Sequence, residues 1–277
     1  MDSDSPARRG RLHGFSINRL IPNILTLAAL CSGLTAIRFA LQGEMRLAVI
    51  AIIVAAIFDA LDGRVARRLG VTSRFGAELD SLSDFLCFGV TPALVLYLAS
   101  LKDGGALGWV VTLMFPICSA LRLARFNTAL VADTPPPAWT GSYFTGVPAP
   151  AGALLALIPL MVSFEIEAAW PRHALVVGAV LVIVGGLMVS RIPTYSFKKG
   201  RVPRHLVLPS LLGAALVMGV LASAPWIAGS LIGLVYVSLI PFSWIAYRRQ
   251  AAQDRQAATS GEVVSLRSVD SGPSTPA

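Results

Sequence analysis

Long apolar stretches recur along most of the chain and are separated by short polar interruptions. A membrane-spanning helix needs about 20 consecutive, mostly apolar residues, and the hydropathy pattern contains eight segments of suitable length. These predicted spans are residues 20–41, 46–68, 76–100, 107–123, 147–165, 173–191, 205–223 and 227–247. The pattern therefore predicts an all-α fold, a polytopic membrane helix bundle with about eight transmembrane helices.

The composition points to a membrane protein as well. Hydrophobic residues make up 55% of the chain, charged residues make up 14%, and the mean hydropathy is +0.69. These values exclude an ordinary soluble domain of this length. We expect one membrane domain, residues 20–249, after a cytoplasmic N-terminal segment, residues 1–19. Residues 250–277 are rich in Ser, Ala and Gln and bury little apolar surface, so they are predicted to form a disordered cytoplasmic tail.

The basic residues are distributed unevenly between the two predicted sides of the membrane. Nineteen of the 23 lysines and arginines fall on one side. They occupy segments 8–19, 64–74, 122–125, 191–204 and 248–267, whereas Arg38, Arg46, Lys102 and Arg172 fall on the other side. Because cytoplasmic loops carry an excess of Lys and Arg, the pattern predicts an inner-membrane protein with both termini in the cytoplasm. It also explains the net charge of +8 without nucleic-acid binding, since a basic cytoplasmic face attracts anionic membrane lipids.

Acidic residues gather in the second and third predicted spans. Five of the 15 acidic residues lie between Asp59 and Asp84, and four of them, Asp59, Asp62, Asp80 and Asp84, fall inside these spans. An ionised aspartate in the centre of a spanning helix costs roughly 2.5–3.5 kcal/mol, so four of them need partners. One reading is a structural ion-pair network with the arginines at 64–68. The other is a site for divalent cations.

The spacing of the aspartates favours the cation site. Asp59 and Asp62 are three residues apart, and Asp80 and Asp84 are four apart, so each pair lies on one helix face. A short turn around residues 69–75 makes the two helices antiparallel neighbours. We therefore expect Asp62 to lie level with Asp80, and Asp59 level with Asp84. Four converging carboxylates can hold two hard cations such as Mg²⁺ or Mn²⁺, which suits displacement at phosphorus.

Small and basic residues stand beside these aspartates. Gly63 and Gly76 would let a nucleotide or phosphate approach the backbone, although glycine also serves close helix packing in membranes. Arg67 lies one helical turn beyond Gly63 and is suited to neutralise a pyrophosphate. On the predicted topology this site faces the cytoplasm.

The run from Asp59 to Asp84 reads D-x-x-D-G-x-x-A-R, then eight residues, then G-x-x-x-D-x-x-x-D. This run resembles the signature of the CDP-alcohol phosphatidyltransferase family without a substitution. The resemblance implies that Asp59, Asp62, Asp80 and Asp84 surround two divalent cations and that Asp84 is the general base. It implies that the CDP group lies beside Gly63, Ala66, Arg67 and Gly76. Residues 21–26, Ile-Pro-Asn-Ile-Leu-Thr, also resemble the start of the family's first helix, which adds Asn23 and Thr26 to the nucleotide contacts.

Further stretches resemble the branch of this family that comprises the bacterial phosphatidylserine synthases. They are residues 78–90, 120–127, 144–150 and 187–198, and with the first span they cover most of residues 20–200. The resemblance implies that the donor is CDP-diacylglycerol and the acceptor is L-serine, with phosphatidylserine and CMP as products. It carries no information on the last two spans or the tail.

The residue pattern gives independent support for an acceptor with a carboxylate. Arg122 and Arg125 are three residues apart at the cytoplasmic end of the fourth span, with Asn127 next to them. Such a pair can clamp a carboxylate, although simple anchoring at the membrane edge gives the same pattern. Arg191 and Lys198 are assigned to lipid phosphate on the same footing, with anchoring as the alternative.

Other functions stay open at this point. Within the same reaction the acceptor alcohol could be choline, glycerol-3-phosphate or an inositol phosphate; choline would favour an aromatic cage and a phosphate would need extra cationic groups. A cation transporter also buries acidic residues, but it would show broken helices or paired halves. Direct displacement is expected, with a cavity open to both bilayer and cytoplasm. A homodimer is one option for the oligomeric state.

Overall fold

The computed structural model describes residues 20–71, 73–130, 143–166, 168–195 and 207–270. Helices dominate these residues, as the apolar pattern predicts, so the all-α fold class is confirmed. The longer helices are α1 (Leu20–Leu41), α2 (Met45–Leu69), α3 (Arg74–Asp84), α5 (Gly105–Leu130), α8 (Ala174–Val189), α9 (Val207–Ser223) and α10 (Pro225–Asp270). The short elements are η2 (Phe85–Val90), α4 (Thr91–Leu96), η3 (Tyr97–Leu101), η4 (Lys102–Gly104), β1 (Tyr143–Thr145), α6 (Ala149–Ala156), α7 (Ile158–Val162), η6 (Trp170–Arg172) and β2 (Pro193–Tyr195).

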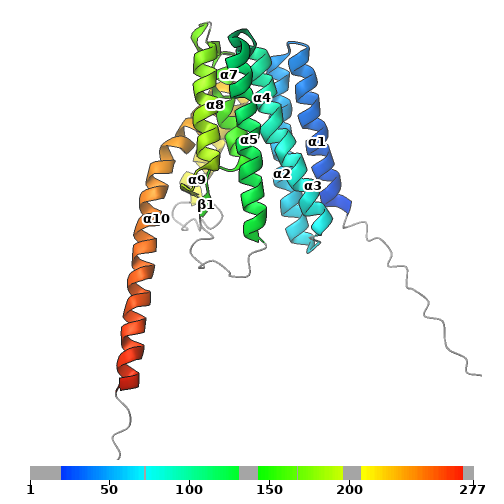
Figure 1. Cartoon of the computed structure of the whole chain (residues 1–277). Helices are drawn as coiled ribbons and strands as arrows, with labels where there is room; N and C mark the ends of the chain where they lie inside the picture. The colour runs from blue at the N-terminus through cyan, green and yellow to red at the C-terminus, as the bar shows by residue number, and fades with distance from the viewer. Residues whose placement is uncertain (1–19, 72, 131–142, 167, 196–206, 271–277) are drawn as a thin grey trace, which may run out of the picture.

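Helices α1 to α8 stand side by side in one bundle (Figure 1). Helix α1 packs along α2, and it also buries a row of small residues, which includes Ala29, Gly33, Ala36 and Ala40. These residues recur every three or four positions, so they share one helix face. A Cβ at Gly33 would lie 2.6 Å from the Cys87 sulfur. Small side chains thus allow the close approach of helices that membrane bundles depend on.

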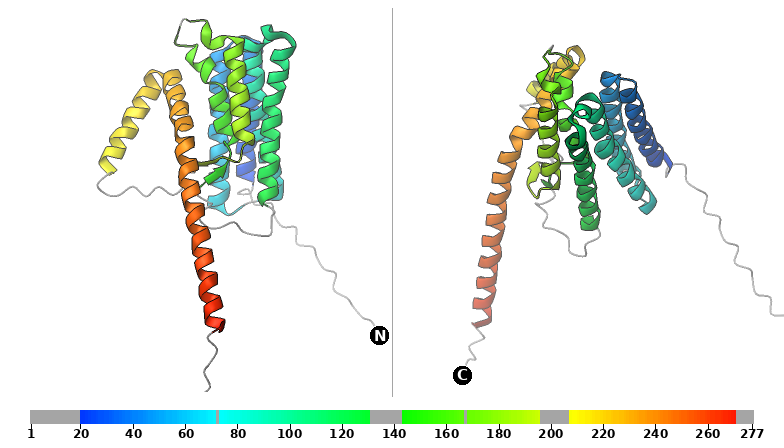
Figure 2. Two further views of the ribbon diagram at one scale, coloured as in Figure 1. Left: turned by 60° about the vertical axis from the view of Figure 1, so that its left-hand side comes forward. Right: turned by 45° about the horizontal axis from the view of Figure 1, so that its top comes forward.

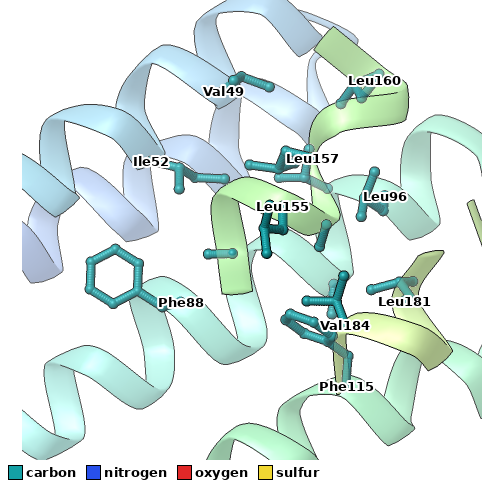
Figure 3. Close-up of a cluster of buried hydrophobic side chains, with 14 of the residues drawn as sticks. Val49, Ile52, Phe88, Leu96, Phe115, Leu155, Leu157, Leu160, Leu181 and Val184 are labelled. Atoms are coloured by element: carbon teal, nitrogen blue, oxygen red, sulfur yellow. The ribbon is translucent and has the colours of Figure 1, made fainter. Parts of the chain in front are cut away.

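Large side chains fill the centre of the bundle, where seven helical elements meet. Figure 3 shows Phe88 of η2 and Phe115 of α5 among leucines, valines and Ile52 from α2, α4, α6, α7 and α8. Both phenylalanines are at most 1% exposed. This apolar centre holds the helices that carry the polar residues described below.

The helix that begins at Arg74 changes geometry immediately after Asp84. Residues Phe85–Val90 form the π-helical segment η2, before α-helix resumes at Thr91. Within it, a Cβ at Gly89 would lie 3.0 Å from the Ser119 Cβ on α5. π-Helical turns often occur at functional sites because they re-aim the adjoining side chains. The hydropathy pattern of this span gave no sign of the change.

A small antiparallel sheet joins the segment before α6 to the segment after α8. Strands β1 and β2 pair with Phe144 opposite Thr194. Gly146 follows β1 with φ of 77°, and a Cβ there would lie 2.6 Å from the Met188 carbonyl oxygen. Only glycine combines this backbone conformation with so close an approach to another chain segment. The pair thereby ties the start of α6 to the end of α8.

Three helical stretches of the described residues are long and apolar enough to cross a membrane: Leu20–Leu41, Arg74–Ala129 and Pro225–Gln250. Two shorter apolar helices, Ala174–Val189 and Leu208–Ser223, accompany them. Helix α2 carries charged residues in its last three turns, and the chain between Ala149 and Val162 is interrupted at Leu157, so neither belongs to these stretches. The expectation of eight spans with both termini in the cytoplasm stays a prediction.

Helices α9 and α10 form a V-shaped pair at one side of the bundle (Figure 2). Helix α10 packs against β2 and α7 and then continues beyond the other helices. It is helical to Asp270 and so includes the first twenty-one residues of the segment for which composition predicted a disordered tail. Residues 251–258 include four alanines and two glutamines, which have high helix propensity.

Candidate active site

A tight turn places α2 and α3 next to each other as antiparallel helices. Helix α2 ends at Gly70, whose φ is 63° and whose N–H donates to the Ala66 carbonyl. Three residues later Ser73 caps α3, and its hydroxyl accepts a hydrogen bond of 3.0 Å from the Gly76 N–H. Glycine after a helix and serine before one are ordinary stop and start signals. This turn fixes the register in which the acidic faces of α2 and α3 meet.

The structure brings the four aspartates of the two helices together. Asp59, Asp62 and Asp80 each offer a carboxylate oxygen, and these oxygens lie within 4.8 Å of one another. The Asp84 carboxyl lies within hydrogen-bonding range of Asp59. Asp62 is buried, with 5% of its surface exposed. Several carboxylates so close to each other repel one another unless protons or cations separate them.

The donor set fits a hard divalent cation. Mg²⁺ and Mn²⁺ prefer carboxylate oxygens, and the triad of Asp59, Asp62 and Asp80 supplies three from two adjacent helices. Within the residues that the structure describes, no other group of at least three acidic, histidine or cysteine side chains meets in this way. These three aspartates can therefore bind a metal ion.

Helix α1 supports this cluster from the side. The Thr26 hydroxyl donates a hydrogen bond of 2.6 Å to Asp62 Oδ2. Ser83 in turn donates to the Thr26 carbonyl oxygen at 3.4 Å. Hydrogen bonds to a ligating carboxylate orient it and are a regular part of metal sites. Ser83 was absent from the sequence prediction, because a serine inside an apolar span carries no distinctive signal.

A cavity of about 460 Å³ opens beside the aspartates. Its lining includes Asp62 and Asp80 together with all six residues assigned to the nucleotide by resemblance: Asn23, Thr26, Gly63, Ala66, Arg67 and Gly76. Three helices, α1, α2 and α3, contribute to it. The structure therefore gathers these six residues around one space.

Glycine is needed at one wall of this cavity. A Cβ at Gly76 would lie 3.0 Å from Asn23 Oδ1 and 3.1 Å from Ser73 Oγ. A Cβ at Gly63 would meet the Arg67 guanidinium at 3.4 Å, which is ordinary contact. Gly76 thus keeps the wall between α1 and α3 free of a side chain. A side chain at position 63 would fit sterically, so Gly63 matters because it leaves space in the cavity.

The two arginines of α5 have different surroundings. Arg122 is buried, with 9% of its surface exposed, and its charged neighbours include Asp84. Arg125 points elsewhere: its guanidinium donates to the backbone oxygens of Val189 at 2.7 Å and Ser190 at 3.0 Å. Arg125 therefore binds the carboxyl end of α8, where unpaired carbonyls favour a cation.

Asn127 and Arg191, which the sequence also assigned to substrate, lie apart from the cavity. Asn127 donates from Nδ2 to the Ser81 hydroxyl at 3.0 Å, so it joins α5 to α3. Arg191 is exposed, two residues after α8 ends. Lys198 lies outside the described residues. Neither Asn127 nor Arg191 is among the described residues that line the cavity beside the aspartates.

A second cavity, of about 480 Å³, is almost wholly apolar. It lies between α2, α6, α7, α9 and α10, and its lining includes Ile53, Leu155, Trp226 and Ile232. Tyr236 of α10 is the one lining residue with a side-chain hydroxyl. A space of this chemistry accepts hydrocarbon rather than a nucleotide.

Comparison with known sequences gives consistent results. A sequence model described as CDP-alcohol phosphatidyltransferase matches residues 19–188. A CDP-diacylglycerol–serine O-phosphatidyltransferase of Mycobacterium leprae is 39% identical over 242 residues, which is 86% of this chain and 80% of the relative. The protein of the same name in Helicobacter pylori is 34% identical and covers 65% of this chain and 73% of the relative. An archaetidylserine synthase of Methanothermobacter thermautotrophicus is 32% identical and covers 62% and 68%.

Proposed function

The chain belongs to the CDP-alcohol phosphatidyltransferase family, and from this premise we propose that it transfers the phosphatidyl group of CDP-diacylglycerol to the hydroxyl of L-serine. The products are phosphatidylserine and CMP. The observation that carries the proposal is the cluster of four aspartates beside a cavity lined by the family's nucleotide residues. The names of the relatives support serine as the acceptor.

We assign Asp59, Asp62, Asp80 and Asp84 to two divalent cations, Mg²⁺ or Mn²⁺. Three of these carboxylates already lie close enough to share one ion, and Asp84 adjoins them through Asp59. When bound, such ions neutralise the charge of the pyrophosphate and of the departing CMP phosphate. Thr26 orients Asp62 for this task through its short hydrogen bond.

Asp84 acts as the general base. Its carboxylate takes the proton from the serine hydroxyl as the serine oxygen bonds to the phosphorus that bears the lipid. The bond from this phosphorus to the bridging oxygen breaks, and CMP leaves with the electron pair. The Arg122 cation lies near this carboxylate. Direct displacement inverts a chirally labelled phosphorus, whereas a covalent intermediate would retain its configuration.

The nucleotide occupies the cavity between α1, α2 and α3. Asn23 and Thr26 contact the CDP group from α1, Gly63 and Ala66 leave room for it, and Arg67 faces the pyrophosphate. Gly76 keeps the opposite wall free of side chains. Since a cavity with one glycine on α2, another on α3 and a cation beside them lets phosphates approach closely, this arrangement suits a diphosphate better than a bulky uncharged group.

The lipid part of the donor lies in the membrane. With eight spans and both termini in the cytoplasm of an inner-membrane protein, the aspartates face the cytoplasm and the lipid enters laterally. The apolar cavity beside α9 and α10 offers a place for acyl chains. Arg191, exposed beyond α8, is proposed to contact lipid phosphate together with Lys198.

Arg122 is proposed as the cation that binds the serine carboxylate. It is buried and lies near Asp84. In contrast, Arg125 donates hydrogen bonds to the end of α8, and Asn127 donates one to the Ser81 hydroxyl. We therefore assign these two residues to the packing that supports the acceptor site.

The test is CMP release from CDP-diacylglycerol by the purified protein in detergent with Mn²⁺ or Mg²⁺. Serine, choline, glycerol-3-phosphate and inositol phosphate are offered separately. Serine-dependent release that needs the divalent cation supports the proposal and excludes a cation transporter. Release with another alcohol alone would keep the fold and the aspartates but overturn the acceptor.

A further inference from the structure

A second polar cluster lies inside the bundle, next to the aspartates. It consists of Arg122 on α5, Thr194 on β2 and Tyr236 on α10. Tyr236 has both Arg122 and Thr194 as neighbours, and Arg122 has Asp84. Three elements far apart in sequence thus converge on one side of the proposed general base.

Two polar atoms in this cluster are left without partners. Arg122 is 91% buried, and its Nε is enclosed without a hydrogen-bond partner among the described residues. The Tyr236 hydroxyl is likewise enclosed, and the described part of the chain supplies it with no partner. Thr194 lies beside Tyr236 and its hydroxyl donates to the Gly146 carbonyl oxygen at 3.0 Å, but the geometry gives no hydrogen bond between the Thr194 and Tyr236 hydroxyls.

Such unpartnered groups indicate a ligand. Buried polar atoms are almost always hydrogen-bonded in folded proteins, because an unpaired one forfeits its bonds to water without replacement. Both of these atoms are N–H or O–H donors, and one belongs to a cation. The group that satisfies both is an anion with more than one oxygen. A carboxylate matches the fork of a guanidinium better than any neutral group does.

The position of the cluster separates it from the nucleotide. The cavity assigned to CDP is lined by Asp62 and Asp80, but by neither Asp84, Arg122 nor Tyr236. Asp84 has among its charged neighbours both Asp80, which lines that cavity, and Arg122 of the donor cluster. An acceptor whose hydroxyl reaches Asp84 would place its other substituents toward Arg122 and Tyr236.

We propose that Tyr236 and Arg122 together bind the carboxylate of the acceptor amino acid, so that α10 completes the acceptor subsite and selects serine over amino alcohols that lack a carboxylate. This inference rests on the proposed function and deepens it. Thr194 serves as a positioning residue, since its bond to Gly146 fixes β2 beside the tyrosine ring. The phenol donates one hydrogen bond and Arg122 Nε another to the carboxylate oxygens.

A lipid phosphate is the competing source of the anion, because Tyr236 also lines the apolar cavity. The two sources differ in a measurable way. A contact to the acceptor changes the KM for serine, and a contact to the donor changes the KM for CDP-diacylglycerol. A variant that removes only the phenol hydroxyl separates them.

The experiment compares Tyr236→Phe with the wild type and with Tyr97→Phe, each as the full chain in detergent. Tyr97 packs edge-on against Trp109, 5.1 Å between ring centroids, away from the aspartates, so it controls for loss of a phenol. We expect the serine KM of Tyr236→Phe to rise about tenfold or more, since the lost bond is to a charged group. The KM for CDP-diacylglycerol should stay as in the wild type, and Tyr97→Phe should leave both values unchanged.

Serinol, in which a hydroxymethyl group replaces the carboxylate of serine, gives a second readout. The wild type should prefer serine strongly, and Tyr236→Phe should reduce this preference about tenfold because only serine loses a contact. Thermal stability in detergent checks that the variant is folded.

The outcomes are distinguishable. An unchanged serine KM in a folded, active Tyr236→Phe overturns the carboxylate contact and leaves the proposed function intact. A raised KM for CDP-diacylglycerol alone also overturns it, in favour of lipid phosphate. If the wild type releases CMP only with acceptors that have no carboxylate, the proposed function and this inference fall together.

Discussion

The two polar corners of the bundle are built in opposite ways. The acidic corner, Asp59, Asp62, Asp80 and Asp84, comes from two adjacent helices joined by a tight turn. The donor corner, Arg122, Thr194 and Tyr236, is assembled from α5, β2 and α10 across 115 positions of the chain. Asp84 and Arg122 lie at the border of the two corners. One corner is thus a local feature of a helical hairpin, and the other exists only in the folded bundle.

The two corners also differ in the charge of the ligand that each requires. Carboxylates within 4.8 Å of each other carry excess negative charge and need cations. Arg122 Nε and the Tyr236 hydroxyl carry donors without acceptors and need an anion. A reaction between a metal-bound diphosphate and an amino acid would satisfy both needs at once. The comparison teaches that a site can be recognised by its unbalanced groups even when its residues are scattered in sequence.

The largest effect is expected at the border of the two corners. Asp84→Asn keeps the size of the side chain but removes the base, and general bases contribute about 10²–10⁴-fold to rate. We expect serine-dependent CMP release to fall by that amount. Rates measured at saturating serine and CDP-diacylglycerol check this.

Asp103→Asn is the matched control, because Asp103 is an exposed aspartate in η4, away from the site. A rate within twofold of wild type in Asp84→Asn would show that Asp84 is not the general base. The two polar corners would then not meet at a catalytic residue.

The next largest effect is expected in the donor corner, at Arg122. Arg122→Lys keeps a positive charge near Asp84 but replaces the guanidinium fork by a point charge. Loss of hydrogen bonds to a charged group costs about 1.5–3 kcal/mol, which corresponds to roughly a 10–100-fold rise in the serine KM. Initial rates over a serine titration measure it. A KM equal to that of the wild type would show that the fork does not read the carboxylate.

Sequence reasoning recovered the acidic corner because its information is local. Predicted segments 20–41 and 46–68 correspond to α1 (Leu20–Leu41) and α2 (Met45–Leu69), and the short turn fixes how α2 and α3 face each other. Helical periodicity then decides which aspartates meet. The spacing also paired Arg125 with Arg122, and the use of this pair to bind a carboxylate stays a prediction. An α-helix puts residues three apart on one face, yet the Arg125 guanidinium donates its hydrogen bond to a backbone oxygen at the end of α8 instead of pointing with Arg122.

The donor corner could not be read in advance for a physical reason. Tyr236 lies in an apolar span that resembles any membrane helix, and nothing in its neighbours along the chain marks its hydroxyl as functional. Thr194 lies in a three-residue strand whose pairing with β1 depends on Gly146. Contacts between distant segments are decided by packing, which periodicity does not encode.

A smaller effect tests the nucleotide wall of the acidic corner. A Cβ at Gly76 meets Asn23 Oδ1 at 3.0 Å, so Gly76→Ala must push Asn23 aside. Overpacking costs about 1–3 kcal/mol, and we expect the KM for CDP-diacylglycerol to rise about tenfold. Gly186→Ala is the control, because a Cβ at that position of α8 meets nothing within 4 Å. Equal KM values for the two alanine variants would contradict the assignment of Gly76 to the cavity wall.

The smallest effect on catalysis is expected at Arg125, next to the donor corner but outside it. Arg125→Met keeps an unbranched side chain but lacks the guanidinium, so it removes two hydrogen bonds to the carbonyls of Val189 and Ser190. These bonds involve a charged donor, so their loss should lower the free energy of unfolding by about 1.5–3 kcal/mol. Thermal unfolding in detergent measures this loss. The serine KM should rise less than it does in Arg122→Lys, because Arg125 acts through the position of α8. If Arg125→Met instead raised the serine KM as much as Arg122→Lys without loss of stability, Arg125 would bind substrate directly, and the donor corner would have to include it.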